Sequence, residues 1–188
     1  RLYKFDIPKA EVVICACARD EKPYIKEWVK YNLDVVKFDR IFLFDNNDVP
    51  GSMDEELAEF DKSRLIVTFE PRKHVQNLLY SEFIQKHKND NMWIAFIDID
   101  EFIVLERHNS IHALLREFLP KGGLLYLKWF MFGSSGKEKQ EDLPVTKRFT
   151  KCDPTSHGLG KSIAFAPCIC MQQDPHFVSV FGPSINVE

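Results

Sequence analysis

The sequence contains no apolar run near the roughly 18 residues that a membrane-spanning helix needs, and it does not open on a charged stretch followed by an apolar one. It has no excess of positive charge either, with 25 Lys and Arg against 28 Asp and Glu for a net charge of −3. A basic field that would attract nucleic acid is therefore missing. We expect a soluble stretch without a membrane span, open to peripheral membrane association, whose partners are small molecules or glycans and not nucleic acid.

The sequence also excludes the pairing of every cysteine in a disulfide, because it has five cysteines, an odd number. Cys15 and Cys17 lie in one apolar run, and Cys168 and Cys170 lie in another. A spacing of two places both thiols of a pair on one face of a strand, whereas zinc sites generally use wider spacing. We expect buried structural thiols in a reducing compartment, which points to the cytoplasm, with the inner face of the membrane as one setting.

Long polar or low-complexity tracts are scarce, and 45% of the residues are hydrophobic. A chain of 188 residues with this composition is expected to form one domain, 1–188, which could continue beyond its last residue. Apolar runs alternate with amphipathic stretches before residue 100, which predicts a mainly parallel sheet with helices on both faces. The expected strands are 11–18, 41–44, 65–69 and 93–97, and the expected helices are 23–38, a short one capped by Ser52, and 74–87.

The pattern changes after residue 100, where we expect a smaller mixed or antiparallel portion of the α/β fold. A helix capped by Asn109 or Ser110 should be followed by a strand at 124–130 and by short strands within 161–170 and 177–181. The small, polar residues of 133–142 predict a surface loop.

Polar clusters follow each of the first four predicted strands. They are Arg19-Asp20, 45–48, 71–74, and Asp98 with Asp100. In an open α/β sheet, ligands bind outside the carboxyl ends of the strands, so these four clusters should meet at one edge. Each cluster alone is also compatible with an ordinary loop, and 45–48 with an Asx-type turn.

Asp98 and Asp100 end the most apolar of these runs, separated by one residue. Two neighbouring carboxylates suit a hard cation, Mn or Mg, whose remaining ligands are waters and substrate phosphates. Solvated charges at a strand end, or a helix cap, are the simpler interpretation. A haloacid-type phosphatase also uses Asp-x-Asp, but on the first strand and with a small residue where this chain has Phe102.

Several segments, in order along the chain, resemble glycosyltransferases of the family 2 and family 92 type. These segments are RDE (19–21), Trp28, FLFDN (42–46), WIAFIDIDEF (93–102), WFMFGSSG (129–136), GKSI (160–163) and DPHF (174–177). The resemblance implies a GT-A fold, with a nucleotide-sugar-binding half over about 11–105 and an acceptor-side half over about 106–188. It also implies a nucleotide-sugar donor, expected to be a UDP-sugar, and a divalent cation, Mn or Mg.

The resemblance further implies roles for individual residues around the nucleotide and the cation. Asp45, with Asn46 or Asp48, would hold the base and ribose, and Arg19, His74, Gln76 and Asn77 would lie near the nucleotide. Asp98 would contact ribose or metal-bound water, Asp100 would bind the metal, and His176 would be a further metal ligand. His157 competes with His176 for that role, and we favour His176 because it adjoins a predicted strand, which would hold the ring better than a loop.

The remaining candidates concern catalysis and the acceptor. Lys161 could neutralise the leaving diphosphate, or could be an ordinary solvated lysine. Glu138, Glu141 and Asp142 are candidate bases for the acceptor hydroxyl, or solvated loop charges. Trp129, Phe130 and Phe132 could stack on an acceptor sugar, although some of them should pack in the core.

The expected function is therefore a metal-dependent hexosyltransferase that moves a sugar from a nucleotide-sugar donor to a glycan or glycolipid hydroxyl, with inversion. Cell-surface polysaccharide or glycoconjugate synthesis is the expected setting. The alternative is a catalytically inactive module of the same fold that binds nucleotide sugar or glycan. The motifs leave the sugar, the acceptor and the linkage open, because a few pocket contacts decide them.

Overall fold

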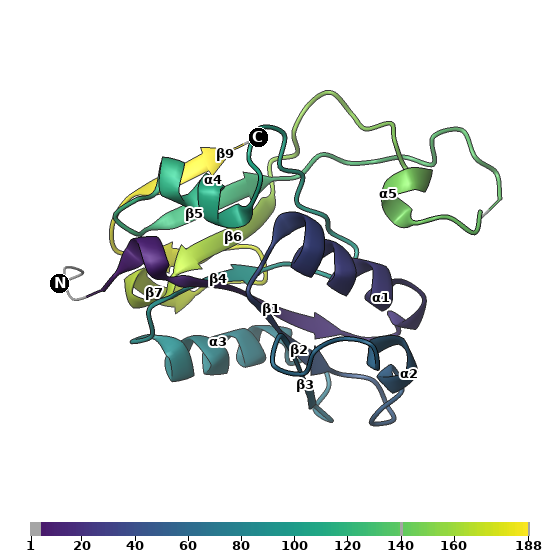
Figure 1. Ribbon diagram of the computed structural model, residues 1–188, viewed down its shortest axis with the longest axis horizontal. Coiled ribbons are helices and arrows are strands. Elements are labelled where there is room, and N and C mark those ends of the chain that lie inside the picture. The colour runs from purple at the N-terminus through teal and green to yellow at the C-terminus, as the bar shows by residue number, and fades with distance from the viewer. Residues whose placement is uncertain (1–4, 140, 188) are drawn as a thin grey trace.

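A seven-stranded sheet runs through the computed structural model, which describes residues 5–139 and 141–187 (Figure 1). Its strand order is β3-β2-β1-β4-β6-β5-β9. The strands of this sheet are β1 (Glu11–Ala18), β2 (Arg40–Asp45), β3 (Leu65–Phe69), β4 (Met92–Phe96), β5 (Leu124–Lys128), β6 (Gly160–Phe165) and β9 (Ser184–Val187). A separate antiparallel pair consists of β7 (Ile169–Gln172) and β8 (Val178–Val180).

The sheet is mostly parallel, as the alternation of strands and helices predicts. Strands β3, β2, β1 and β4 pair in parallel, β6 is antiparallel to β4 and β5, and β9 is parallel to β5. The chain winds outward from β1 to β3 and then returns to place β4 on the other side of β1. The order of the strands therefore reverses between β1 and β4, which is where open α/β sheets bind ligands.

Helices cover both faces of the sheet, which confirms a second prediction (Figure 1). The helix α3 (Gln76–His87) packs on one face, and α1 (Lys22–Lys30) and α4 (Ile111–Phe118) pack on the other. Shorter elements are α2 (Asp54–Leu57), α5 (Val145–Arg148), the single turns η2 (Ile7–Lys9) and η4 (Ala166–Cys168), and the π-helical η3 (Tyr31–Val36). Because β4 lies between two apolar cores, all five of its residues are buried.

Two of the predicted helix boundaries are corrected. The predicted helix 23–38 changes to π-helical geometry after Lys30 and ends at Val36, where Lys37, with a φ of +66°, caps it. The buried side-chain amide of Asn32 donates to the main-chain carbonyl of Trp28 at 2.9 Å, and such a side-chain bond competes with the regular main-chain pattern of an α-helix. Ser52 does not cap α2, because that helix begins at Asp54.

The cap of α4 follows the prediction, because the Ser110 hydroxyl accepts a hydrogen bond from the Ala113 amide at 3.2 Å. The second cysteine pair does not follow it. Cys168 is the buried last residue of the 3-10 turn η4, whereas Cys170 is exposed in β7, so the two thiols do not share one strand. All five cysteines are free.

A long excursion, residues 129–159, connects β5 to β6 and extends past α1 (Figure 1). Its two arms are held together by the Phe132–Cys152 bridge and by main-chain bonds such as Gly133 N–H to the Lys151 carbonyl at 3.1 Å. The predicted polar loop lies at its tip, where the residues described within 133–142 form no helix or strand. The helix α5 in its returning arm was not predicted.

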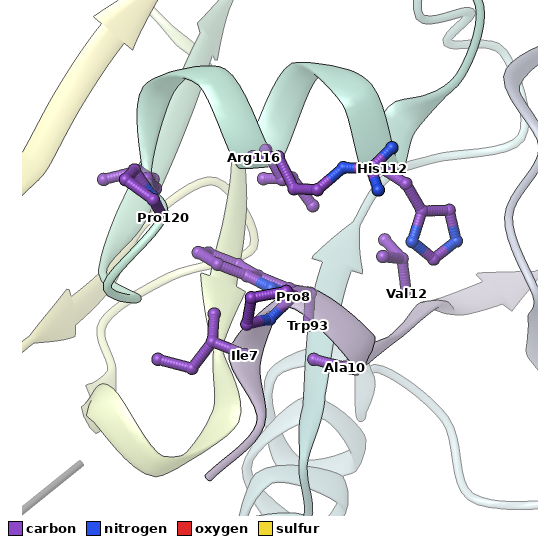
Figure 2. A pocket seen from close by; sticks show the side chains of 10 residues that line it. Ile7, Pro8, Ala10, Val12, Trp93, His112, Arg116 and Pro120 are labelled. Carbon is purple, nitrogen blue, oxygen red and sulfur yellow. The ribbon is translucent and has the colours of Figure 1, made fainter. Parts of the chain in front are cut away.

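A small apolar pocket of about 220 Å³ lies between η2 and α4, near the amino ends of β1 and β4 (Figure 2). Trp93 lies between Ile7 and Pro8 on one side and the α4 side chains on the other, and exposed residues such as Pro8 and Arg116 border the pocket, so it is partly open to the surface. In the ranges 5–139 and 141–187, no helix has the length and apolar character to span a bilayer.

Candidate active site

A polar pocket of about 340 Å³ opens at the carboxyl ends of β1 and β4, where the strand order reverses. Six residues that the sequence analysis singled out line it: Arg19, Asn46, His74, Gln76, Asp98 and Asp100. They follow four different strands, so the expectation that the polar clusters meet at one edge of the sheet is confirmed. Cys17 and Glu21 also line the pocket and were not predicted to do so.

Two buried asparagines tie together the loops that follow β1, β2 and β3. The Asn47 side-chain oxygen accepts the Asp20 amide at 2.8 Å, and its side-chain nitrogen donates to Asp45 at 2.6 Å. The Asn46 side-chain nitrogen donates to the carbonyls of Glu70 at 2.7 Å and Arg72 at 2.5 Å. Buried amides satisfied in this way hold loops in one geometry, so the rim of the pocket is preorganised.

The three residues predicted to hold the base and ribose differ in how far they are exposed to the pocket. Asp45 is 2% exposed, accepts from Asn47 and does not line the pocket. Asn46 lines the pocket but is only 6% exposed. Asp48 is exposed at the rim, where its carboxylate pairs with Arg19 at 3.4 Å and with Lys73. The main chain of Asp20 and of His74 is left-handed, with φ of +60° and +56°, a geometry that only a well-determined loop maintains.

Asp98 lies two residues beyond the end of β4, in a turn, and is held from both sides. Gln76 from α3 donates to its Oδ1 at 2.8 Å, and Lys161 from β6 donates to its Oδ2 at 2.5 Å. Asp98 and Asp100 both line the pocket, although β4 ends at Phe96 and neither residue lies in a strand.

Glu101 completes a buried charge cluster beneath the pocket. It accepts the Asp98 amide at 2.9 Å and lies 3.6 Å from the Lys161 ammonium. Burial raises the pKa of Glu101 to about 7, while the nearby Lys161 acts in the opposite direction. The side chain of Lys161 is only 3% exposed, so it is not the solvated lysine of the simpler interpretation. The sequence reasoning missed Glu101, although its position beside the acidic pair was a signal.

Asp100 is the exposed carboxylate of the pair. Among the residues that the structure describes, no side chain forms a hydrogen bond or ion pair with it. Burial raises the pKa of the neighbouring Glu21, and the charges of Asp100, Asp20 and Asp98 raise it further. The floor of the pocket therefore concentrates negative charge, which favours a cation next to Asp100.

The described residues fit a divalent cation only in part. Within 5–139 and 141–187 there is no group of three His, Cys, Asp or Glu residues arranged to hold a metal. Both oxygens of Asp98 are engaged by Gln76 and Lys161, which leaves Asp100 as the available carboxylate. His176 lies instead against Trp129, edge-on, with ring centroids 5.0 Å apart.

The residues predicted for the acceptor lie beside the buried lysine. The Lys161 ammonium is 5.8 Å from the centroid of the Trp129 ring, whose other neighbours are His157 and His176. Phe130 and Phe132 are exposed on the excursion. Trp129 and Lys161 thus connect the excursion to the floor of the pocket.

The candidate bases lie at the tip of the excursion. Glu138, Glu141 and Asp142 are exposed, and Glu141 pairs with Lys137 four residues earlier. None of the three lines the pocket. The structure therefore does not bring them together with Asp98 and Asp100.

The comparisons with known sequences agree on one family, glycosyltransferase family 92. The sequence model of glycosyltransferase family 92 matches residues 68–152, which include Asp98, Asp100 and Trp129. A glycosyltransferase family 92 protein of Oryza sativa subsp. japonica is 29% identical over 141 residues, covering 73% of this chain and 24% of the relative. A family 92 protein of Arabidopsis thaliana is 25% identical, covering 66% and 22%. A family 92 protein of Ricinus communis is 25% identical, covering 76% and 26%.

The chain thus spans about a quarter of the length of the curated relatives that it matches. Among solved structures it is similar to 4-diphosphocytidyl-2C-methyl-D-erythritol synthase from Anaerococcus prevotii, at 12% identity, with 84% of this chain and 71% of that chain covered. The TM-score of that match is 0.47. The family model and the relatives all belong to glycosyltransferase family 92, so the similarity is to that family.

Proposed function

We propose that this chain forms the donor-binding domain of a GT-A-type glycosyltransferase. In this proposal a UDP-sugar binds in the polar pocket, and its hexose is transferred, with inversion, to a hydroxyl of a glycan or glycolipid. The observation that carries the proposal is the convergence of Arg19, Asn46, His74, Gln76, Asp98 and Asp100 where the strand order reverses. Such a position is where open α/β sheets bind nucleotides.

The roles follow from where each group lies. Asn46, His74 and Gln76 line the pocket on the side of the β2 and β3 loops, and they would contact the nucleoside together with the nearby Asn77. Asp100 would hold Mn or Mg, with the donor diphosphate supplying further oxygen ligands. Such a cation supplies positive charge that stabilises a leaving diphosphate.

Lys161 takes a different role from the one expected. Because it is buried and bonded to Asp98, it is better suited to orient that carboxylate than to meet a leaving group directly. Trp129 and Phe132 form the acceptor side of the proposal, and Glu141 or Asp142 remain the proposed bases, brought near the donor by movement of the excursion. The expected cytoplasmic setting, in cell-surface polysaccharide or glycoconjugate synthesis, belongs to the same proposal.

The test compares the protein with its Asp100→Asn variant. Product formation from labelled UDP-sugars with Mn should fall by about a hundredfold to a thousandfold, because a group that stabilises developing charge is lost. Asp34→Asn, on the exposed face of η3, makes the same change in charge away from the pocket and should keep full activity.

Full activity in Asp100→Asn would overturn the cation assignment. Tight UDP binding without product from any donor and acceptor tried would support the inactive binding module instead. Equal melting temperatures of the two variants and the unmodified protein establish that the comparison concerns the site and not folding.

A further inference from the structure

The cations around the pocket differ in how firmly they are held. Arg72 bonds to Glu70 at 2.8 Å and to Glu82 at 3.0 Å, and its bonds to Glu70 lower the pKa of Glu70 to about 2. Lys161 is buried against Asp98. Arg72 is 46% exposed but holds the nearly buried Glu70 with two side-chain nitrogens, and Lys161 is buried, so an anionic ligand would have to break strong local bonds to reach either cation.

Arg19 and Lys73 are held only at the surface. Arg19 follows β1, Lys73 follows β3, and both pair with the carboxylate of Asp48, which follows β2. That carboxylate is 72% exposed, and the Arg19 and Lys73 side chains are 42% and 39% exposed. Exposed ion pairs contribute little to stability and exchange readily, so a stronger anion can displace Asp48.

The loops that carry these cations are fixed even though the side chains are not. Asp20, next to Arg19, is bonded through its amide to the buried Asn47. The stretch before Lys73 is bonded through the carbonyls of Glu70 and Arg72 to the buried Asn46. The two cations are therefore presented by rigid main chain at one rim of the pocket, and Arg19 lines it.

We propose that Arg19 and Lys73 form a clamp for the diphosphate of the donor, and that Asp48 occupies this clamp as an internal anion until the donor displaces it. This inference rests on the proposed function and names the residues that would bind the phosphates. A diphosphate carries more charge than one carboxylate and offers oxygens that match the planar fork of arginine. Asp48 then lowers donor affinity, contrary to the expectation that it holds the base or ribose.

The two roles of Asp48 predict opposite results for Asp48→Asn. If Asp48 competes for the clamp, the variant should bind UDP and inorganic pyrophosphate about fivefold more tightly, the size expected for one exposed ion pair. Its affinity for uridine should not change. If Asp48 instead holds the base or ribose, the variant should bind both UDP and uridine more weakly.

The experiment measures the affinity for UDP, uridine and pyrophosphate by isothermal titration calorimetry. Arg19→Gln and Lys73→Gln should each weaken UDP and pyrophosphate binding by about tenfold and leave uridine unchanged. In the Arg19→Gln/Lys73→Gln background, Asp48→Asn should have no further effect, which separates a specific pairing from a general loss of negative charge. Asp34→Asn is the matched control and should match the unmodified protein.

The outcomes separate this inference from the proposed function. If UDP binds and Asp48→Asn weakens it or leaves it unchanged, the clamp is wrong and the proposed function stands. If pyrophosphate binding follows the predicted pattern but UDP binds no better than pyrophosphate, the clamp stands and the nucleotide-sugar assignment is wrong. Failure of the unmodified protein to bind either ligand overturns both.

Discussion

Lys161 shows how one residue links the two portions of the sheet. It lies on β6, antiparallel to β4, and reaches Asp98 just beyond the end of β4. The residue before it must be glycine, because a Cβ on Gly160 would lie 2.0 Å from the carbonyl oxygen of Leu127 on β5. The close approach of β5 and β6 is therefore part of what positions the ammonium under the pocket.

Substitution Lys161→Met should lower the free energy of unfolding by about 3 kcal/mol, because it leaves the partly buried carboxylates of Asp98 and Glu101 without their cation. Urea denaturation at pH 8 measures this, and Lys62→Met, at an exposed position, should change stability little. The double variant Lys161→Met/Glu101→Gln should recover part of the loss, since it removes one unpaired charge. Unchanged stability in Lys161→Met would contradict the interpretation of this cluster.

At the residue scale, the sequence predicted the pocket residues that follow strands, but not the contacts of the charged side chains that lie under the pocket. Asp98, Asp100 and Arg19 were found because strand ends converge at a known edge of an α/β sheet. The depth of Lys161 and the engagement of Glu101 depend on the pairing of β6 with β4, which local patterns do not reveal. Lys73 lies in the predicted polar cluster 71–74 but was given no role of its own, because the role of a charged loop residue depends on a partner that the sequence does not identify.

At the scale of elements, apolar runs predicted β1 and β4 well because both faces of these two strands are covered. The helix boundaries were harder to predict, since side chains such as Asn32 redirect main-chain bonding locally. The course of the excursion was not predictable, because it depends on a distant contact. Glu27 on α1 accepts hydrogen bonds from the amides of Val145 at 2.8 Å and Thr146 at 3.3 Å, and so anchors α5.

Substitution Glu27→Ala should release α5 from α1 without unfolding the sheet. Losing a cap of about 1 kcal/mol should raise the rate of trypsin cleavage at Lys147 and Arg148 by about fivefold. The matched control is Glu59→Ala, which removes an exposed partner of Lys26 and leaves α5 in place. Equal cleavage rates in the two variants would show that Glu27 does not anchor the excursion.

At the scale of the whole molecule, two apolar cores, one on each face of the sheet, support a polar edge whose charges do not all cancel. A ligand that neutralises this edge should stabilise the folded chain as a whole. The size of the effect follows from mass action, because binding to the folded state alone shifts the unfolding equilibrium.

In the presence of Mn, UDP at about 100 times its dissociation constant should contribute about 2.7 kcal/mol of stabilisation, or roughly 5–10 °C in melting temperature. Differential scanning fluorimetry measures this shift, and EDTA should remove the part that depends on the cation. In Asp100→Asn, EDTA should make little difference. A shift that EDTA leaves intact in the unmodified protein would argue against a cation-dependent site.

The bond between Lys161 and Asp98 also has a consequence for the order of folding. The two residues are 63 positions apart, whereas β1, β2, β3 and β4 are assembled from contiguous strand-helix units. During synthesis the acidic turn leaves the ribosome well before its counter-ion, and contacts of long sequence separation form late. The polar pocket would thus form completely only when β6 docks beside β4, so ligand binding should report on the last stage of folding.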